Sequence, residues 1–398
     1  MAADYDCAII GAGMVGASAA VALARRGLAV ALLERRAAPS SQAIAADVRA
    51  LVLSAASVEI LSAAGLWTAL ALQAEAITDI HVHERGQFGA VRLNARSAGL
   101  AALGWACPAD GLLASVQSAA EHCAGVSAHW GAHYTGHRVA DDEVRITFEQ
   151  DGTQGSLPAR LLSAADGADS AVRDTAGIAL DVHDYAQDAI VANLVVSRPQ
   201  AHTAFERFTM RGPLALIPRG GARYVAVQCL DRDGAESAVA LSDSDYLTLL
   251  ERRFGLRLGR LSQLGARHRH RLIRREAARL TAPRLALAGN AARTVHPNAA
   301  QGLNLGLRDV AALVALLGPG VDGGSGAVLA RYAASRADDQ SRTVGFTDAL
   351  AQGFISRSPL VACARRAALT AAAHLPGLRR RLVVEASGLA ALRRIENA

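Results

Sequence analysis

Three glycines near the start of the chain have the spacing of a phosphate-binding turn. Gly11, Gly13 and Gly16 follow a short apolar run, Tyr5–Ile10, and precede an alanine-rich stretch of helical character, Ala17–Arg26. The first glycine allows a tight turn, the second lets a pyrophosphate approach the backbone, and the third lets helix and strand pack closely. The helix N-terminus offers free N–H groups and a positive dipole end to the phosphates. The motif predicts a dinucleotide site, against the alternative of a purely structural turn.

An acidic residue further along supports the dinucleotide interpretation. Glu34 ends a second strand-like run, Leu28–Leu33. It follows Gly11 at about the 20-residue distance at which an acid meets the ribose diol. Because a carboxylate disfavours a nearby 2′-phosphate, the tightly bound ligand is expected to be NAD or FAD rather than NADP.

Two later segments carry the other candidate residues. In the first, a strand-like run, Leu157–Ala164, leads into Asp166 and Gly167. In the second, a buried-type strand, Leu285–Gly289, runs into a Gly-Asn turn, a His-Pro loop and a glycine-flanked helix start. The candidates in that segment are Gly289, Asn290, His296, Pro297, Gln301, Gly302 and Asn304. Together the glycines and Asn304 could present backbone N–H groups to an anionic ring edge.

The elements that must position these residues fall into two kinds. Strands alternate with helices in the first part of the chain, which predicts an α/β unit with a parallel sheet. Residues 189–230 form short strand-like runs separated by Gly/Pro turns, which predicts an antiparallel sheet. Ala50–Leu72 has helical spacing, Gly318–Gly326 is expected to be a loop, and Ala327–Ala398 is expected to be helical throughout.

Composition excludes several classes of chemistry. All 42 basic residues of the 398 are arginine, so no lysine Schiff base, P-loop lysine or lysine nucleophile is available. The five cysteines are scattered without a CxxC pair, which indicates reduced thiols in a cytoplasmic protein and excludes flavin-disulfide chemistry. No signal peptide or membrane-spanning run is expected, and no metal is expected, because the nearest candidate histidines lack a placed carboxylate. Aromatic residues are only 4% and are not interleaved with the arginines, so nucleic acid is not an expected partner.

The formal net charge of +6 is concentrated at one end of the chain. Residues 361–398 hold seven arginines against two glutamates, which leaves +1 for the other 360 residues. A basic amphipathic helix can lie on an anionic membrane surface. The sequence therefore predicts a nearly neutral body with a basic tail that either docks on a membrane or packs on the body as a solvated face.

Taken together, the three motifs resemble those of the single-component FAD-dependent aromatic hydroxylases. The most specific stretch is HPxxxQGxNxGxRD, which here runs from His296 to Asp309. Further similarity lies in Arg49–Ser57 and in Ala204–Pro218, and the resemblance extends from about Asp4 to about Phe354. Within these enzymes the chain looks most like the ubiquinone-biosynthesis hydroxylases, in particular those acting on 2-polyprenyl-6-methoxyphenol.

The resemblance implies a role for each matching residue. Gly11, Gly13, Gly16 and Glu34 would hold the ADP half of FAD. Arg49 would lie near the FAD phosphates or ribityl chain. Asp166 and Gly167 match a motif linked to FAD and to transient NAD(P)H binding. The isoalloxazine ring and ribityl chain would meet Gly289, Asn290, Pro297, Gln301, Gly302 and Asn304.

The chain departs from the family pattern at two places. Asn290 stands where relatives usually have aspartate; its carbonyl oxygen can still accept a hydrogen bond, without the charge-assisted part. The branch acting on 2-polyprenyl-6-methoxyphenol also tends to carry Gly-Asn here. Ala300 stands where relatives usually have glycine, which would allow backbone angles that alanine resists.

The activity implied is hydroxylation of a polyprenylated phenol ring by NAD(P)H and O₂, through an oxygen adduct at the flavin C4a carbon. His296 is the one titratable side chain expected beside the ring and is the candidate general base, with loop hydrogen bonding as the alternative.

Other interpretations are an aromatic hydroxylase of another small phenol and a non-catalytic flavoprotein in a quinone-synthesis assembly. A flavin halogenase would need a lysine near its substrate, and this chain has none. A homo-oligomer or an enzyme assembly and a peripheral position on the inner membrane are further expectations.

The resemblance also predicts an α/β fold in which an antiparallel-sheet substrate domain is inserted into a Rossmann-like FAD-binding domain. The FAD-binding domain is expected at residues 1–76, 98–180 and 271–326, the substrate domain at 77–97 and 181–270, and a C-terminal helical region with the basic tail at 327–398.

Overall fold

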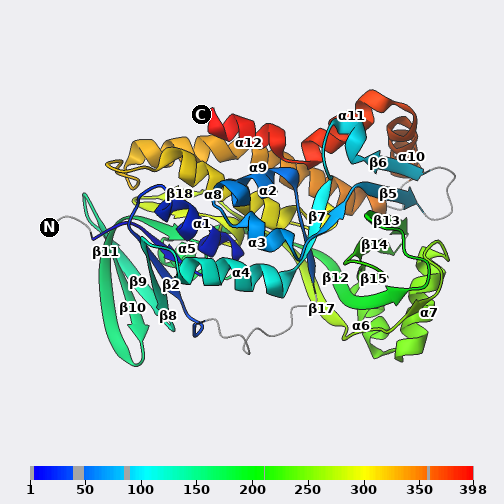
Figure 1. The fold of residues 1–398 in the computed structure, drawn as a ribbon, viewed down its shortest axis with the longest axis horizontal. Helices are drawn as coiled ribbons and strands as arrows, with labels where there is room; N and C mark the ends of the chain where they lie inside the picture. Colours follow the sequence, from blue (N-terminus) through cyan, green and yellow to red (C-terminus); the bar gives the residue numbers. More distant parts are fainter. Residues whose placement is uncertain (1–3, 39–48, 85–89, 210, 356–358, 398) are drawn as a thin grey trace.

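The computed structural model describes residues 4–38, 49–84, 90–209, 211–355 and 359–397. Its N-terminal unit is built on a sheet whose central strand is β1 (Tyr5–Ile10). Parallel strands β2 (Val30–Glu34) and β11 (Thr153–Ala164) flank β1. Two further parallel strands lie outside them, β8 (Val126–Trp130) beside β2 and β19 (Leu285–Leu287) beside β11. The predicted parallel α/β unit is confirmed (Figure 1).

Antiparallel strands extend this sheet on the side of β11 and β19. Strands β9 (His133–Val139) and β10 (Val144–Gln150) form a meander with β11, and β18 (Thr281–Ala282) pairs with β19. The helices of this unit that precede residue 200 are α1 (Met14–Ala24), α2 (Ala55–Ala63), α3 (Trp67–Ala71), α4 (Ala109–Glu121) and α5 (Ala171–Thr175).

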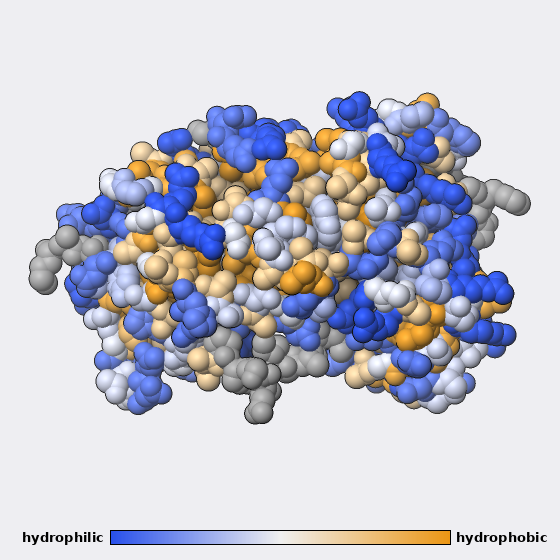
Figure 2. Space-filling view, viewed as in Figure 1, coloured by the Kyte–Doolittle hydropathy of each residue, from blue (hydrophilic) through white to orange (hydrophobic). Residues whose placement is uncertain are grey.

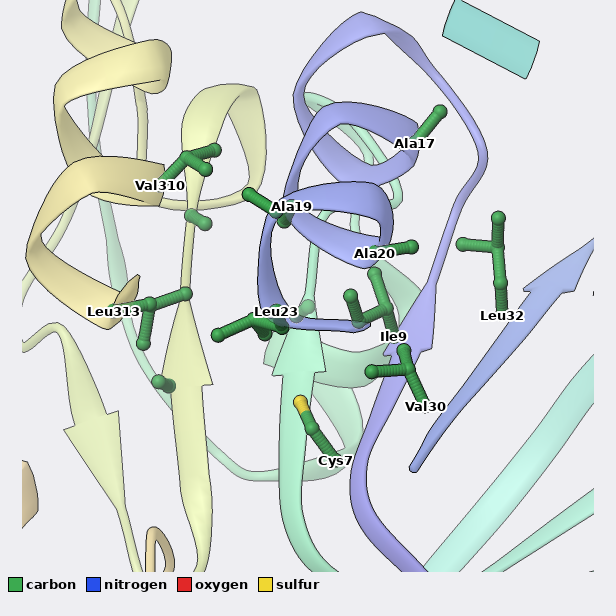
Figure 3. Close-up of a cluster of buried hydrophobic side chains, with 14 of the residues drawn as sticks. Cys7, Ile9, Ala17, Ala19, Ala20, Leu23, Val30, Leu32, Val310 and Leu313 are labelled. Atoms are coloured by element: carbon green, nitrogen blue, oxygen red, sulfur yellow. The ribbon is translucent and has the colours of Figure 1, made fainter. Parts of the chain in front are cut away.

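Small side chains let α1 lie close to its neighbours. The helix is rich in alanine, a strong helix former, and its residues from Gly16 to Ala24 are buried. Figure 3 shows Val310 and Leu313 of α8 (Gln301–Leu316) beside Ala19 and Leu23 of α1. Cys7 is fully buried in this cluster. The core therefore holds α1 and α8 together. The N-terminus of α1 carries the first motif, Gly11–Gly16, and the N-terminus of α8 carries part of the third motif, Gly289–Asp309.

A second sheet of nine strands carries the predicted antiparallel unit. Its main strands are β12 (Leu180–Val196), β13 (Thr203–Thr209), β14 (Gly212–Pro218), β15 (Arg223–Asp231) and β17 (His268–Ala277). Short strands β16 (Leu261–Ser262) and β20 (Arg293–Thr294) and the hairpin of β5 (Asp79–Glu84) with β6 (Ala90–Asn94) complete it. Helices α6 (Arg232–Ala240) and α7 (Asp243–Phe254) belong to one face. The pair β13–β5 is parallel and joins two segments that lie far apart in the chain.

A small third sheet corrects one sequence-based expectation. The segment Ala50–Leu72 was expected to be helical, but it begins with a strand, β3 (Ala50–Leu53), which pairs with β7 (Gly104–Pro108); β4 (Glu75–Ile77) pairs with the same strand. Ser54 then caps α2 by accepting a hydrogen bond from the Ser57 backbone. The partner strand β7 lies about 50 residues further along the chain, so local periodicity does not reveal the pairing.

The C-terminal part is helical in its described residues, as expected. It contains α9 (Gly326–Ile355), α10 (Pro359–His374), α11 (Pro376–Ala386) and α12 (Leu389–Glu396). The apolar side chains of α12, among them Leu392 and Ile395, are buried in the main core. Arg393 pairs with Glu59 of α2 at 3.1 Å, and hydrophilic side chains gather along the upper edge in Figure 2, over α12 and around α11. This end of the basic tail therefore packs on the body with its polar side outward.

Within the described residues, none of the helices combines the length and the apolar character needed to cross a membrane.

Candidate functional site

The glycine turn after β1 is built as the motif predicts. Gly11 has φ +99°, and a Cβ there would lie 2.6 Å from the Ala165 carbonyl oxygen. A Cβ at Gly16 would lie 1.9 Å from the Gly11 carbonyl oxygen. By contrast, a Cβ at Gly13 would meet nothing within 4 Å, at the exposed N-terminus of α1. Protein contacts thus require glycine at the first and third positions, while the second leaves open space where a pyrophosphate would need it.

The carboxylate of Glu34 is held beside this turn. Its Oε2 accepts a hydrogen bond from the Ala12 backbone at 2.8 Å, and its Oε1 accepts one from the Arg36 backbone at 3.0 Å. From the other side, Gln117 of α4 donates to the Ala12 carbonyl oxygen at 2.8 Å. The Ala12 peptide is therefore fixed by two side chains. The motif pointed to Glu34, but nothing in the spacing of the sequence pointed to Gln117.

The second motif meets the first at the carboxyl end of the sheet. Asp166 follows β11, and its Cα is one of the atoms that a Gly11 Cβ would strike, at 2.8 Å. Its Oδ2 accepts a hydrogen bond from the Val172 backbone at 3.2 Å, while its Oδ1 is buried with no partner among the described residues. Burial raises the pKa of Asp166. Gly167 beside it has φ +96° and open space around its Cα.

The third motif begins at the same edge of the sheet. Strands β19, β11 and β1 are adjacent and parallel, so their carboxyl ends bring Asn290, Asp166 and Gly11 to one side. Gly289 has φ +59°, and a Cβ there would lie 3.1 Å from Val15 of α1. Asn290 is exposed in the short 3₁₀ turn Gly289–Ala291.

A buried ion pair anchors that turn. Asp309, the last residue of the third motif, accepts a hydrogen bond from the Gly289 backbone at 3.0 Å and pairs with Arg336 of α9 at 2.7 Å. Both side chains are completely buried. Arg336 also contacts Asp339 at 2.8 Å, as does Arg308. Burial opposes the charge of Arg336, but Asp309 and Asp339 outweigh it and raise its pKa. The motif's final acid therefore holds the turn rather than facing outward.

The His-Pro loop folds back on itself. His296 is 1% exposed, and its Nδ1 accepts a hydrogen bond from the Asn298 backbone at 3.3 Å. Burial lowers its pKa to about 4, so the ring is neutral at pH 7. Its Nε2 is buried without a partner among the described residues. These contacts favour the loop hydrogen-bonding alternative over a general base, because a base with so low a pKa binds protons weakly near neutral pH.

The same loop contains backbone strain where the sequence departs from the family pattern. Ala300 has φ +50° and ψ +39°, in the left-handed region, directly before α8. Pro297 is exposed, Gln301 is buried at the first position of α8, and Gly302 is half-buried. Alanine thus adopts the backbone angles that a glycine would take at lower cost.

Asn304 is committed to protein partners. Its Oδ1 accepts hydrogen bonds from the Ser54 backbone at 2.8 Å and the Ser57 hydroxyl at 2.7 Å. Its Nδ2 donates to the carbonyl oxygens of Val52 at 2.8 Å and Ala300 at 2.6 Å. The side chain therefore ties β3 and α2 to the start of α8. It positions the loop that would face a flavin ring instead of offering its own amide.

Arg49 lies immediately before β3, and residues 39–48 ahead of it are outside the described chain. Its side chain is exposed, and its carbonyl oxygen accepts a hydrogen bond from the Ala109 backbone at 3.1 Å. Because β3 is tied to Asn304, Arg49 belongs to the same side of the unit as the third motif.

Tyr185 of the second sheet joins this region, although sequence reasoning missed it. Its ring packs edge-on against His296, with centroids 4.8 Å apart. Its hydroxyl donates to Asp348 of α9, whose other oxygen accepts from Arg274 at 2.7 Å. The substrate-side sheet is thereby attached to the His-Pro loop.

The comparisons with known proteins agree with this architecture. The model of the FAD binding domain family matches residues 4–347. Ubiquinone hydroxylase UbiL of Rhodospirillum rubrum is 33% identical over 387 residues, covering 96% of this chain and 89% of the relative. The 3-demethoxyubiquinol 3-hydroxylase of Escherichia coli is 31% identical, covering 96% of this chain and 98% of the relative. Among solved structures, p-nitrophenol 4-monooxygenase PnpA of Pseudomonas putida shares the fold, with a TM-score of 0.78 at 19% identity, covering 100% of this chain and 99% of that one.

The fold and the matched domain define an FAD-dependent monooxygenase, with NAD(P)H as the co-substrate typical of this class. The open space at Gly13 and the unpartnered Asp166 oxygen fit a bound dinucleotide at the same sheet edge. The chain belongs to the family of FAD-dependent ubiquinone-biosynthesis hydroxylases.

Proposed function

We propose that this protein hydroxylates the ring of a polyprenylated phenol of the 2-polyprenyl-6-methoxyphenol type in ubiquinone biosynthesis. The two hydroxylase relatives, each aligned with most of this chain, support a substrate on that route. The observation that carries the flavin part of the proposal is the open space at Gly13, bordered by the fixed Glu34 carboxylate and the unpartnered Asp166 oxygen.

In this proposal the residues of the sheet edge hold FAD. Gly11, Gly13 and Gly16 admit its pyrophosphate, and Glu34 binds the ribose diol. Bound FAD supplies the oxygen-activating chemistry with NAD(P)H as reductant. Arg49 lies near the phosphates or the ribityl chain, and Asp166 and Gly167 contact the middle part of the cofactor.

The third motif shapes the flavin-ring end. Asn290 accepts from a ribityl hydroxyl through its amide oxygen. Pro297, Gln301 and Gly302 border the ring, while Asn304 and the Asp309 ion pair hold the loop and the turn in place. His296 orders the loop through Asn298 and Tyr185, and this enclosure keeps water from the reacting centre.

We assign the FAD-binding domain to residues 1–76, 98–180 and 271–326, the substrate domain to 77–97 and 181–270, and the C-terminal helical region to 327–398. Peripheral contact with the inner membrane is proposed for the arginine-rich segment Arg379–Arg381 rather than for α12, whose apolar side chains are buried. A homo-oligomer or a quinone-synthesis assembly remains part of the proposal.

The first test measures NAD(P)H-dependent oxygen uptake by the FAD-loaded protein with added phenols, together with the quinone precursor that accumulates on deletion of the gene. A rise in uptake with a phenol and accumulation of a 2-polyprenyl-6-methoxyphenol are expected. Uptake that no phenol stimulates would refute the hydroxylase and favour a non-catalytic flavoprotein. Stimulation by small phenols together with an unchanged quinone pool would indicate an aromatic hydroxylase of another pathway.

The second test is Gly13→Val. Because a Cβ at Gly13 meets no protein atom within 4 Å, the variant is expected to fold like the wild type and to lose its flavin. Purification with full flavin absorbance would show that the cofactor lies elsewhere.

A further inference from the structure

One acidic side chain lies on the face of the second sheet that turns away from α6 and α7. In β13, Phe205 packs into the apolar cluster with α7, so the next residue, Glu206, points to the opposite face. There its register partners are Val82 of β5 and Ala215 of β14, and Ala215 is in turn opposite Val227 of β15. Glu206 therefore stands in a row of apolar side chains.

Both ends of this face reach the third motif. At one end, Tyr185 packs against the cluster of Ala189, Cys229 and Leu272, and its ring contacts that of His296. At the other end, Ala204 and Ile217 pack with Val52 and Ala106 of the third sheet.

The carbonyl oxygen of Val52 accepts the hydrogen bond from Asn304. Glu206 thus lies on the face that spans from the His-Pro loop to the strand held by α8, two residues along β13 from Ala204. Helix α9 packs against β13 and β14 as well.

The surroundings of Glu206 are partly accessible and apolar. Glu206, Ala215, Val227 and Val82 all keep some exposed surface. Burial raises the pKa of Glu206 to about 7. The pKa of Cys229 is raised mainly by burial and in addition by the charge of Glu206. The row of Val82, Glu206, Ala215 and Val227 therefore combines apolar side chains, which suit an aromatic ring and an alkyl chain, with one carboxyl group.

We infer that Glu206 binds the phenolic hydroxyl of the substrate and takes its proton when the ring reacts. The O–H bond of the phenol breaks as an O–H bond to the carboxylate forms, and Glu206 afterwards releases the proton to solvent. Loss of the proton raises the electron density of the ring, which must act as the nucleophile in hydroxylation. A carboxyl group that titrates near neutral pH suits both halves of this cycle. The inference rests on the proposed function and names the residue that recognises its substrate class.

The other titratable groups on or over this face are accounted for separately. They are Glu84 on β5, Cys229 on β15, His268 and His270 on β17, Arg219 after β14, and the Tyr185, Asp348 and Arg274 set from β12, α9 and β17. Arg219 donates to the Asn193 amide at 3.0 Å, and Arg274 is paired with Asp348 and Asp181. None of these groups lies in the row formed by Val82, Glu206, Ala215 and Val227.

The experiment compares the binding of two probes to the FAD-loaded full-length protein between pH 6 and pH 8. The probes are 2-methoxyphenol and 1,2-dimethoxybenzene, which lacks the hydroxyl, and binding is followed by flavin absorbance and calorimetry. If only the carboxylate form accepts the phenol, the wild-type affinity for 2-methoxyphenol rises about tenfold over this range, since a group titrating at about 7 goes from mostly protonated to mostly ionised. The affinity for 1,2-dimethoxybenzene does not rise.

Glu206→Gln is expected to abolish the pH dependence and the preference for the phenol. Glu236→Gln, the same substitution at an exposed position of α6, should behave like the wild type. Glu206→Asp keeps the carboxyl group and should retain a weaker pH dependence, which separates the chemistry from simple disruption of the sheet.

Persistence of the wild-type pH dependence in Glu206→Gln would overturn the role of Glu206 while leaving hydroxylation intact. A wild-type protein whose oxygen uptake no phenol stimulates would overturn the proposed function and the inference together.

Discussion

The buried pair of Asp309 and Arg336 offers the sharpest test of how the third motif is held. Asp309→Asn keeps the size of the side chain and an oxygen that can accept from the Gly289 backbone, but it removes the charge. Arg336, which is completely buried, then loses one of its two acidic partners. Leaving a buried charge without its partner costs about 3–5 kcal/mol.

That cost translates into a measurable change in melting temperature. At about 2.1 cal/mol/K per residue, unfolding of the 398-residue chain carries an entropy of about 0.8 kcal/mol/K. A loss of about 3–5 kcal/mol therefore lowers the Tm by about 4–6 °C. Differential scanning fluorimetry of the flavin-free protein measures it. The flavin content after purification should also fall, because the turn at Gly289 is less firmly held.

A double-mutant cycle decides whether the charge is the cause. Arg336→Met in the Asp309→Asn background removes the excess charge, so the double variant should recover part of the loss, with a coupling of about 1–3 kcal/mol. An Asp309→Asn protein that melts within about 1 °C of the wild type would refute the reasoning. A double variant whose loss equals the sum of the two single losses would do the same.

Three further predictions concern the turn and the loop. Gly16→Ala forces a Cβ toward the Gly11 carbonyl oxygen, so stability should fall by about 1–3 kcal/mol and flavin should be lost; an unchanged Tm with full flavin would contradict this packing. Ala300→Gly relieves a left-handed backbone that costs about 1–2 kcal/mol, partly offset by glycine's freedom when unfolded, so the Tm should rise slightly; a fall of several degrees would argue against the strain. His296→Phe keeps a ring beside Tyr185 but removes a group whose folded pKa of about 4 lies below its unfolded value near 6.5. The unfolded wild type binds the extra proton as the pH falls through this window, so its stability should drop between about pH 6.5 and 4 more steeply than that of the variant; parallel Tm profiles would contradict the assignment.

The features predicted most accurately from sequence are those in which a local steric rule decides. Gly16 leaves room for the Gly11 carbonyl oxygen in the same turn, and Gly11 leaves room for the Ala165 carbonyl oxygen after the neighbouring strand β11. Glu34 was predictable because β2, which ends at Glu34, runs parallel to β1 and so ends at the same edge of the sheet as the glycine turn. The antiparallel sheet was also predictable, because short strand-like runs between Gly and Pro turns pair with their neighbours in sequence.

The features that were missed depend on partners far away in sequence. The strand at Ala50–Leu53 exists because β7 pairs with it, although its local spacing fits a helix. That Asn304 lines the ring stays a prediction, but three of its four hydrogen bonds join it to residues about 250 positions earlier, which its spacing does not reveal. For the basic tail the sequence left two alternatives open, and the buried Leu392 and Ile395 show that its last helix packs on the body.

By itself, the sequence determined the phosphate-binding turn, the acid that follows it, the absence of lysine chemistry and the likeness of three motifs to one class of flavoenzyme. Those features depend on residue type and short spacing, which are independent of contacts between distant parts of the chain. Only the tertiary structure decided which motif residues face open space and which form hydrogen bonds or ion pairs that hold other parts of the protein in place. It also set Glu206 on the face that spans from His296 to Val52. Strand register selects the face of a side chain, and register is a property of paired strands rather than of one segment.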